Sequence, residues 1–194
     1  GLHVLTEKNY KISLEDEKIV WLHEFIVRPR EEQSILWSED LKHNLEEAIQ
    51  LIWEGKVEDD GLNQLVTVAG LSIREIIILR VYCRYLKQID FIYSKDFVIQ
   101  IFLEYAPITV KLIQLFYKLL DPKEAALSGR QAAQHITAFE EQLNTVETND
   151  GDKIFRQFLN LILSTVRTNY FVIKELTVNS AFCVKFDSRL LDNL

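Results

Sequence analysis

The feature that most constrains this chain is a long run of helical patterning between residues 61 and 171, interrupted by glycine and proline. Apolar residues recur there at three- and four-residue spacings, which places them on one face of a helix. Gly70, Pro107 and the Asp121-Pro122 pair interrupt the pattern, because glycine frees the backbone and proline removes an amide donor. Short amphipathic helices bury their apolar faces against one another. The sequence therefore predicts a mainly α fold, a multi-helix bundle-like domain.

The helices expected from this pattern share an apolar face and a recognisable start or end. Ser38 before two acidic residues, and Ser72 three residues before Glu75, are typical N-terminal caps, the second of them a capping box. The helix after Ser72 is apolar nearly all round, so we expect it at the centre of the domain. The expected helices are 41–53, 62–69, 73–89, 97–105, 108–120, one around 136–143 and one over 154–166, with helical character up to about residue 171.

Strand character is expected at the two ends of the chain. Residues 2–12 and 18–28 are rich in β-branched and aromatic residues, and a short polar link between them predicts a β-hairpin that ends at Pro29. Residues 177–186 predict one C-terminal strand. Residues 1–60 hold 15 acidic and 7 basic residues, whereas the rest of the chain is nearly balanced, so we expect a boundary near residues 58–61.

Composition excludes several classes of protein. The 194 residues are 48% hydrophobic and 26% charged, which argues against disorder, and the net charge of −7 argues against nucleic-acid binding. No uninterrupted apolar run reaches membrane-spanning length, and the N-terminus lacks the pattern of a signal peptide, so we expect no membrane partner. Two distant cysteines, Cys83 and Cys183, match no metal or redox spacing, which favours a reducing, cytoplasmic compartment.

Residues that could carry chemistry are few. The six glycines are too far apart for a phosphate-binding loop, so we expect no bound nucleotide. The four histidines form no metal-binding spacing, and His23 is expected to be an ordinary strand histidine. Cys83 lies in the most apolar helix, where a free thiol usually acts as a small hydrophobic group. We therefore expect no catalytic, cofactor-binding or metal-binding residue in this chain.

Two polar features have more than one interpretation. Arg80, Arg84 and Lys87 share one face of the central helix, either as a solvent-facing strip or as an interface for an acidic neighbour such as the acidic leading segment or another domain. The second feature lies at the end of the last helix and on the last strand, where either ion pairing or binding of a substrate carboxylate would account for it. Its residues are Arg167, Thr168, Asn169, Lys185, Asp187 and Arg189.

Three stretches of the chain resemble a known family. They are VEDDGLNQLVTVAGLSIREIIILRVYCRYLKQ (57–88), DKIFRQFLNLILSTVRTNYF (152–171) and VKFDSRLL (184–191). In their order and approximate spacing they closely resemble the large bacterial NAD-specific glutamate dehydrogenases, and the opening strand pair is also similar to a part of that family. The resemblance covers most of the chain and is weakest over residues 122–148.

The resemblance implies that this chain is a fragment of a much longer oxidoreductase of amino-acid catabolism. Residues 1–57 would be the end of an ACT-like α+β module, 58–171 a helical domain, and 172–194 a strand leading toward a catalytic domain that is absent here. The parent enzyme would oxidatively deaminate L-glutamate with NAD, as a cytoplasmic homo-oligomer. The fragment would bind no NAD and would act as a non-catalytic helical or regulatory segment that contacts other domains or subunits. The alternative is a free-standing helical interaction module without enzymatic activity.

Overall fold

The computed structural model of the 194-residue chain describes residues 2–14, 18–29, 37–123, 129–176 and 181–191. The chain divides into two compact units, Gly1–Trp37 and Ser38–Leu194. The first unit contains a β-hairpin and the second contains the helices. The predicted mainly α fold with an N-terminal hairpin is confirmed.

The N-terminal unit is formed by strands β1 (Leu2–Ser13) and β2 (Ile19–Pro29), which pair antiparallel. Tyr10 lies opposite Leu22 in the register, and a bulge interrupts the ladder between Val4 and Thr6. Both predicted strands are confirmed within one residue at each end. The proposed likeness of this region to an ACT-like module stays a prediction.

The second unit follows the predicted helical pattern closely. Its helices are α1 (Glu39–Trp53), the 3₁₀ helix η1 (Gly61–Gln64), α2 (Leu65–Ala69), α3 (Ile73–Gln88), α4 (Lys95–Glu104), α5 (Ala106–Leu120), α6 (Gly129–Leu143) and α7 (Asn149–Ser164). Ser38 caps α1, and Ser72 with Glu75 forms the predicted capping box of α3. Gly70 ends α2 with a φ of 68°, a left-handed conformation that glycine adopts without strain.

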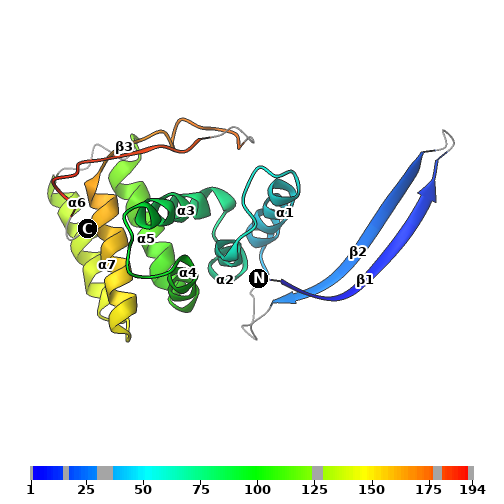
Figure 1. The fold of residues 1–194 in the computed structure, drawn as a ribbon, viewed down its shortest axis with the longest axis horizontal. Coiled ribbons are helices and arrows are strands. Elements are labelled where there is room, and N and C mark those ends of the chain that lie inside the picture. Colours follow the sequence, from blue (N-terminus) through cyan, green and yellow to red (C-terminus); the bar gives the residue numbers. More distant parts are fainter. Residues whose placement is uncertain (1, 15–17, 30–36, 124–128, 177–180, 192–194) are drawn as a thin grey trace. The chain divides into compact units, whose positions relative to one another are not determined.

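Helix α3 lies at the centre of this unit, as its nearly all-apolar sequence predicts. It crosses α5 and α7 (Figure 1), and the fully buried Tyr82 of α3 meets Phe116 of α5 and Phe158 of α7 edge to face. Phe102 of α4 packs on Phe158 with ring centroids 4.8 Å apart. These aromatic contacts join four helices into one core, so none of the four buries its apolar face alone.

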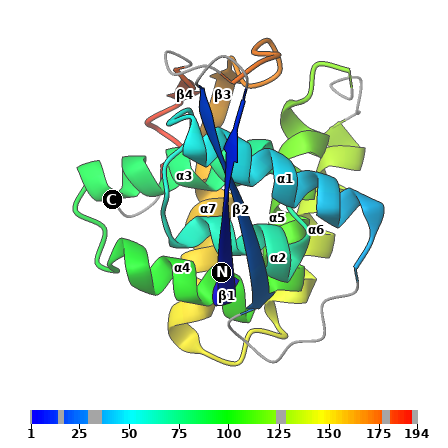
Figure 2. The ribbon, with the colours of Figure 1, turned by 90° about the vertical axis from the view of Figure 1, so that its right-hand side faces the viewer.

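The predicted helix toward residue 171 and the predicted strand 177–186 are both partly wrong. Helix α7 stops at Ser164, and residues 165–168 form strand β3 (Thr165–Thr168), which pairs antiparallel with a short strand β4 (Val184–Phe186). Figure 2 shows the two strands side by side. The β-branched Thr165 and Thr168 pair with Phe186 and Val184 in this ladder, and pairing with distant residues overrides the local helical pattern. Residues 177–180 lie outside the described residues.

None of the described helices is by itself long and apolar enough to cross a membrane. Helices α4 and α5 reach that length and composition only as a pair, and their axes differ by 101° at the break between them. The break falls near Pro107, as the sequence predicts: Glu104 ends α4, and Pro107 itself lies in the first turn of α5, which begins at Ala106 and not at the predicted residue 108.

Candidate functional site

Arg80 of α3 is the most deeply buried charged group of the predicted basic face, with a side chain only 5% exposed. Its Nε and Nη2 donate to the two carboxylate oxygens of Asp60 over 3.1 and 2.8 Å. Nη2 also donates to Asn63 Oδ1 over 2.9 Å. A guanidinium that holds both oxygens of one carboxylate is a strong and directional ion pair. The prediction that Arg80 belongs to a solvent-facing strip is therefore wrong.

Asp60 is the centre of this charge cluster. It caps η1 by accepting a hydrogen bond from the Leu62 amide, and it also accepts one from Lys95 Nζ of α4 over 2.8 Å. Partial burial alone would raise the pKa of Asp60, but the hydrogen bonds from Arg80 and Lys95 hold it below its usual value. One carboxylate thus ties the start of η1 to α3 and α4.

The other two residues of the predicted stripe have different surroundings. Arg84 is exposed and forms an ion pair with Glu58, which also faces Arg80. Lys87 is exposed in the last turn of α3 and has no ion pair with any described residue. The acidic neighbour of Arg80 and Arg84 is therefore a loop of the same chain, residues 58–60. An interface at Arg84 and Lys87 stays a prediction.

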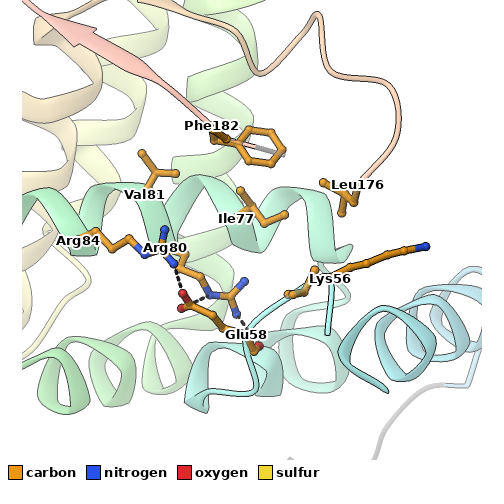
Figure 3. Close-up of a pocket in the computed structure, with 10 residues that line it drawn as sticks. Lys56, Glu58, Ile77, Arg80, Val81, Arg84, Leu176 and Phe182 are labelled. Carbon is orange, nitrogen blue, oxygen red and sulfur yellow. Dashed lines mark hydrogen bonds and ion pairs between the residues drawn. The ribbon is translucent and has the colours of Figure 1, made fainter. Parts of the chain in front are cut away.

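A pocket of about 200 Å³ opens beside this cluster. Ile77 and Val81 of α3 face it together with Arg80 and Arg84, and Phe182 lies across from them (Figure 3). Glu58 pairs with Arg84 and also lies 3.5 Å from Arg80 Nε, while Arg80 is held mainly by Asp60, so the positive charge beside the pocket is already paired (Figure 3). The residues that line this pocket are Lys56, Val57, Glu58, Ile77, Arg80, Val81, Arg84, Leu176, Ala181 and Phe182. They include no serine, threonine or cysteine, and the two side chains that could act as nucleophiles are ion-paired, Lys56 with Glu54 over 2.6 Å and Glu58 with the arginines of α3.

A second pocket, of about 380 Å³, lies between the end of α3 and the start of α4. Cys83 reaches its wall but is only 7% exposed, and burial raises the pKa of its thiol to about 12. A thiol with so high a pKa is protonated at neutral pH and is a poor nucleophile. The prediction that Cys83 acts as a small hydrophobic group is confirmed.

Arg74 fixes the segment after β3 to the start of α3. Its guanidinium donates to the carbonyl oxygens of Tyr170, Ile173 and Lys174 over 2.9, 2.6 and 3.3 Å. It also lies 5.0 Å from the centre of the Tyr170 ring, within the range of a cation–π contact. We call this contact the Arg74 clamp. It joins residues about 100 positions apart in the sequence, so no local pattern could have predicted it.

A second connection runs from the middle of α3 to both C-terminal strands. The buried Tyr82 hydroxyl lies 2.9 Å from Thr165 Oγ1 at the start of β3, and burial raises the pKa of this tyrosine. The rings of Tyr85 and Phe186 of β4 are stacked at an angle, with centroids 4.5 Å apart. Helix α3 therefore supports the inner face of the β3–β4 ribbon.

The outer face of that ribbon carries charge. Arg167 of β3 lies opposite Lys185 of β4, both exposed, and neither has an ion pair with a described residue. Asp187 and Arg189 pair with each other over 2.7 Å, and the hydrogen bond from Arg189 lowers the pKa of Asp187 to about 2. The predicted ion pairing is thus confirmed for Asp187 and Arg189 only. The predicted position of Arg167 at a helix end is wrong, since it lies in β3.

The start of α7 is capped by its own chain. Gly151 lies in the first turn of α7 and its amide donates to Thr148 Oγ1 over 3.2 Å, and an added Cβ there would meet that oxygen at 2.6 Å and a Val146 methyl at 2.9 Å. No group of three or more His, Cys, Asp or Glu in the described part of the chain could hold a metal ion. His23 lies in β2, 3.3 Å from Glu7, as an ordinary strand histidine.

Comparison with known families identifies two matching regions. Residues 57–122 match the model of glutamate dehydrogenase helical motif 3, and residues 138–194 match that of the bacterial NAD-glutamate dehydrogenase catalytic domain. The chain is 31% identical over its full length to an NAD-specific glutamate dehydrogenase of Mycobacterium tuberculosis and covers 12% of that protein. It is 32% identical over 88% of its length to the enzyme of the same name from Halomonas elongata, and 30% identical over its full length to the one from Pseudomonas aeruginosa.

The chain belongs to the family of large bacterial NAD-specific glutamate dehydrogenases, and it spans only about 10–12% of the length of these relatives. The catalytic-domain match begins at residue 138, inside α6, and includes α7, β3 and β4. The two matched regions nevertheless share one core, because α3 from the first contacts α7 and both strands from the second. The predicted division at residue 171 stays a prediction.

Proposed function

We propose that this chain is the non-catalytic helical segment that supports the beginning of the catalytic domain in an NAD-specific glutamate dehydrogenase. The parent enzyme converts L-glutamate, NAD⁺ and water into 2-oxoglutarate, ammonium and NADH, as a cytoplasmic homo-oligomer. The observation that carries this proposal is the common core of residues 57–122 and 138–194, built around α3. A core of this kind lets the helical region set the position of the first catalytic-domain strands.

Two kinds of contact provide this support, apolar packing and hydrogen bonds. Tyr82, Phe158 and Phe186 pack by apolar contact, which fixes the depth of the strands but has little directionality. The Arg74 clamp adds three hydrogen bonds to backbone carbonyls, which fix the direction of the chain as it leaves β3. The segment thereby acts as a rigid support, and the chemical step belongs to residues elsewhere in the parent.

The clamp provides the test of this proposal. Arg74→Met in the full-length enzyme keeps an aliphatic stem but removes the donors to three carbonyls, so we expect lower turnover and faster amide exchange over residues 169–176. Arg156→Met is the matched control, because Arg156 is exposed and its one ion pair within the described ranges is with Asp152, one turn away on α7. Unchanged turnover and unchanged exchange in Arg74→Met would contradict the supporting role.

The isolated chain provides a second test, of the non-catalytic part of the proposal. We expect titration of NAD into the purified 194-residue chain to give no binding heat, because its six glycines are too far apart to form a phosphate-binding loop. Saturable heat with one-to-one stoichiometry would show that the chain holds part of the cofactor site.

A further inference from the structure

The guanidinium group of Arg80 has hydrogen-bond donors that the neighbouring residues do not use. An arginine side chain carries five N–H donors, one on Nε and two on each terminal nitrogen. Nε and Nη2 donate to Asp60 and Asn63, and Nη2 also lies 3.4 Å from the Glu58 carbonyl oxygen. Nη1 is buried and has no hydrogen-bond partner among the described residues. A buried donor without an acceptor is costly, so we expect a further group to accept from Nη1.

This free donor is directed toward the pocket of about 200 Å³ beside α3. Because Nε and Nη2 hold Asp60 on one side of the planar guanidinium, Nη1 lies on the other side. Figure 3 shows this nitrogen, which has no dashed line, pointing into the space between Ile77 and Lys56, two residues that line the pocket. The Arg80 side chain is only 5% exposed, so bulk water does not supply the acceptor. The pocket is therefore the place from which an acceptor would come.

The ion-pair network beside the pocket has one positive charge in excess. Each cation has a partner, but three cations share two carboxylates: Arg80, Arg84 and Lys95 share Glu58 and Asp60. Lys56 pairs separately with Glu54, and Asp59 is exposed and has no ion pair with a described residue. A ligand with a single negative charge would balance this network, whereas a ligand with two would leave one charge uncompensated.

The walls of the pocket are largely apolar. Ile77 and Val81 of α3 form one wall and Phe182 lies across from them (Figure 3), with Leu176 and Ala181 beside it. Water alone fits such walls poorly, because a buried water needs about two to four polar partners. At ~30 Å³ for each water-sized group, the pocket has room for about six to eight non-hydrogen atoms. A small molecule with one acceptor group and an apolar tail fits both the size and the lining.

We propose that this pocket binds a small monocarboxylate with a short aliphatic tail of about four to six carbon atoms. Its carboxylate accepts from Arg80 Nη1, and its tail packs against Ile77, Val81 and Phe182. Arg80 lies in the region 57–122 and Phe182 in the region 138–194, so a bound ligand contacts both matched regions at once. The site does not depend on the proposed role of α3 as a support for the catalytic domain.

Titration of the purified 194-residue chain with 4-methylpentanoate, followed by the amide chemical shifts of Val81 and Phe182, tests the site. We expect saturable one-to-one binding with a dissociation constant of about 1 mM or lower. The neutral 4-methylpentanamide and the dicarboxylate glutarate should each bind at least about tenfold more weakly, because the first lacks the charge and the second lacks the apolar end. Shifts that do not saturate would overturn the proposal, since the pocket would then hold only water. Equal binding of the three compounds would also overturn it.

Two alanine positions provide a matched pair of variants. Ala181 and Ala133 are both exposed, but only Ala181 lines this pocket. Ala181→Phe fills part of the pocket without touching an ion pair, so we expect it to weaken binding of 4-methylpentanoate at least about tenfold, and we expect no change in Ala133→Phe. Equal affinity in both variants would show that the ligand binds elsewhere and would overturn the proposal.

The role of the free donor needs a variant of its own. Arg80→Lys keeps the positive charge but removes Nη1, and we expect it to lose about tenfold in affinity. Circular dichroism shows whether this variant is folded, and Ala181→Phe decides the outcome if it is not. The full-length protein should give the same order of affinities. Binding to the 194-residue chain alone would overturn the proposal, because another part of the polypeptide would then fill the pocket.

Discussion

The hairpin and the helical unit have similar amounts of apolar sequence but opposite surroundings for it. Phe25 and Trp21 of β2 are about half exposed, whereas Phe102 and Phe158 in the helical unit are fully buried. The helices bury their apolar faces because they pack against one another, and a ribbon of two strands has no second layer of its own. Similar apolar content therefore does not by itself give similar burial.

The largest expected difference between the two units is in the stability lost when a phenylalanine is replaced by alanine. Phe158→Ala removes a fully buried ring that contacts Tyr82 and Phe102, and we expect it to lower the free energy of unfolding of the isolated chain by about 3–5 kcal/mol. Phe25→Ala should change it by less than about 0.5 kcal/mol, because half of that ring is already in water. Chemical denaturation followed by circular dichroism measures both losses. Similar losses for the two variants would contradict the expected difference between the buried and the exposed ring.

The charged residues of α3 give a second, smaller contrast, this time within the helical unit. Arg80→Met should destabilise the isolated chain by about 2–3 kcal/mol, because it leaves the Asp60 carboxylate with Lys95 as its only remaining cation. Arg84→Met should cost at most about 1 kcal/mol, since its pair with Glu58 is solvent-exposed. Equal effects in a denaturant titration would mean that the buried ion pair of Arg80 contributes no more to stability than the exposed ion pair of Arg84. For the same reason, charge reversal at Arg80 tests folding and not docking.

The pH dependence of stability distinguishes the contribution of Asp60, in the charge cluster around Arg80, from that of Asp187. The pKa of Asp60 is lower in the folded chain than in the unfolded one, so its contribution is present above about pH 4 and is lost as the pH falls below that value. We expect the difference in unfolding free energy between the native chain and Asp60→Asn to shrink in that range. Asp187 also has a lowered pKa, but its partner Arg189 is exposed, so the contribution of this pair should be screened by 1 M salt, unlike that of Asp60. A difference that is constant between pH 7 and pH 2 would contradict this assignment.

Features that depend on neighbours in sequence could be predicted from the residues alone. The capping residues Ser38 and Ser72, the stop at Gly70 and the break near Pro107 all act within one helical turn, and each lies where the sequence placed it. The hairpin could also be predicted, because a short polar link joins its two strands in the sequence.

Features that depend on distant residues could not be predicted in this way. The β3–β4 ladder requires Thr165 to meet Phe186, and the helical pattern of α7 continues locally past the point where that pairing takes over. The burial of Arg80 depends on the approach of Asp60, 20 positions earlier. On the sequence alone, Arg80 and Arg84 looked equivalent, and only the position of one loop distinguishes them.

A smaller effect is expected for the cap of α3, on which the position of Arg74 also depends. Ser72→Ala removes the oxygen that accepts from the Glu75 amide and should cost about 1 kcal/mol. Thr148→Ala at the start of α7 is a matched control, since that side chain likewise caps by accepting from the Gly151 amide. Similar losses in thermal or chemical unfolding are expected for the two, and an unchanged midpoint for Ser72→Ala would mean that the cap does not contribute to stability.

The smallest expected effect on the isolated chain, and the most informative one for the full-length protein, concerns the exposed end of the basic face. Arg84→Glu with Lys87→Glu should change the unfolding free energy of the isolated chain by no more than about 1 kcal/mol, because both side chains are in water. If these two residues contact an acidic neighbouring domain or subunit, the same variant weakens assembly of the full-length enzyme at low salt, and the difference from the native protein decreases as salt screens the contact. Lys111→Glu with Lys153→Glu is the control, since it reverses two exposed charges elsewhere on the same helical unit. Sedimentation that is equal for both variants and the native enzyme at low salt would leave Arg84 and Lys87 as a hydrated surface, and would restrict the contacts of α3 to the core, the acidic loop and the C-terminal strands.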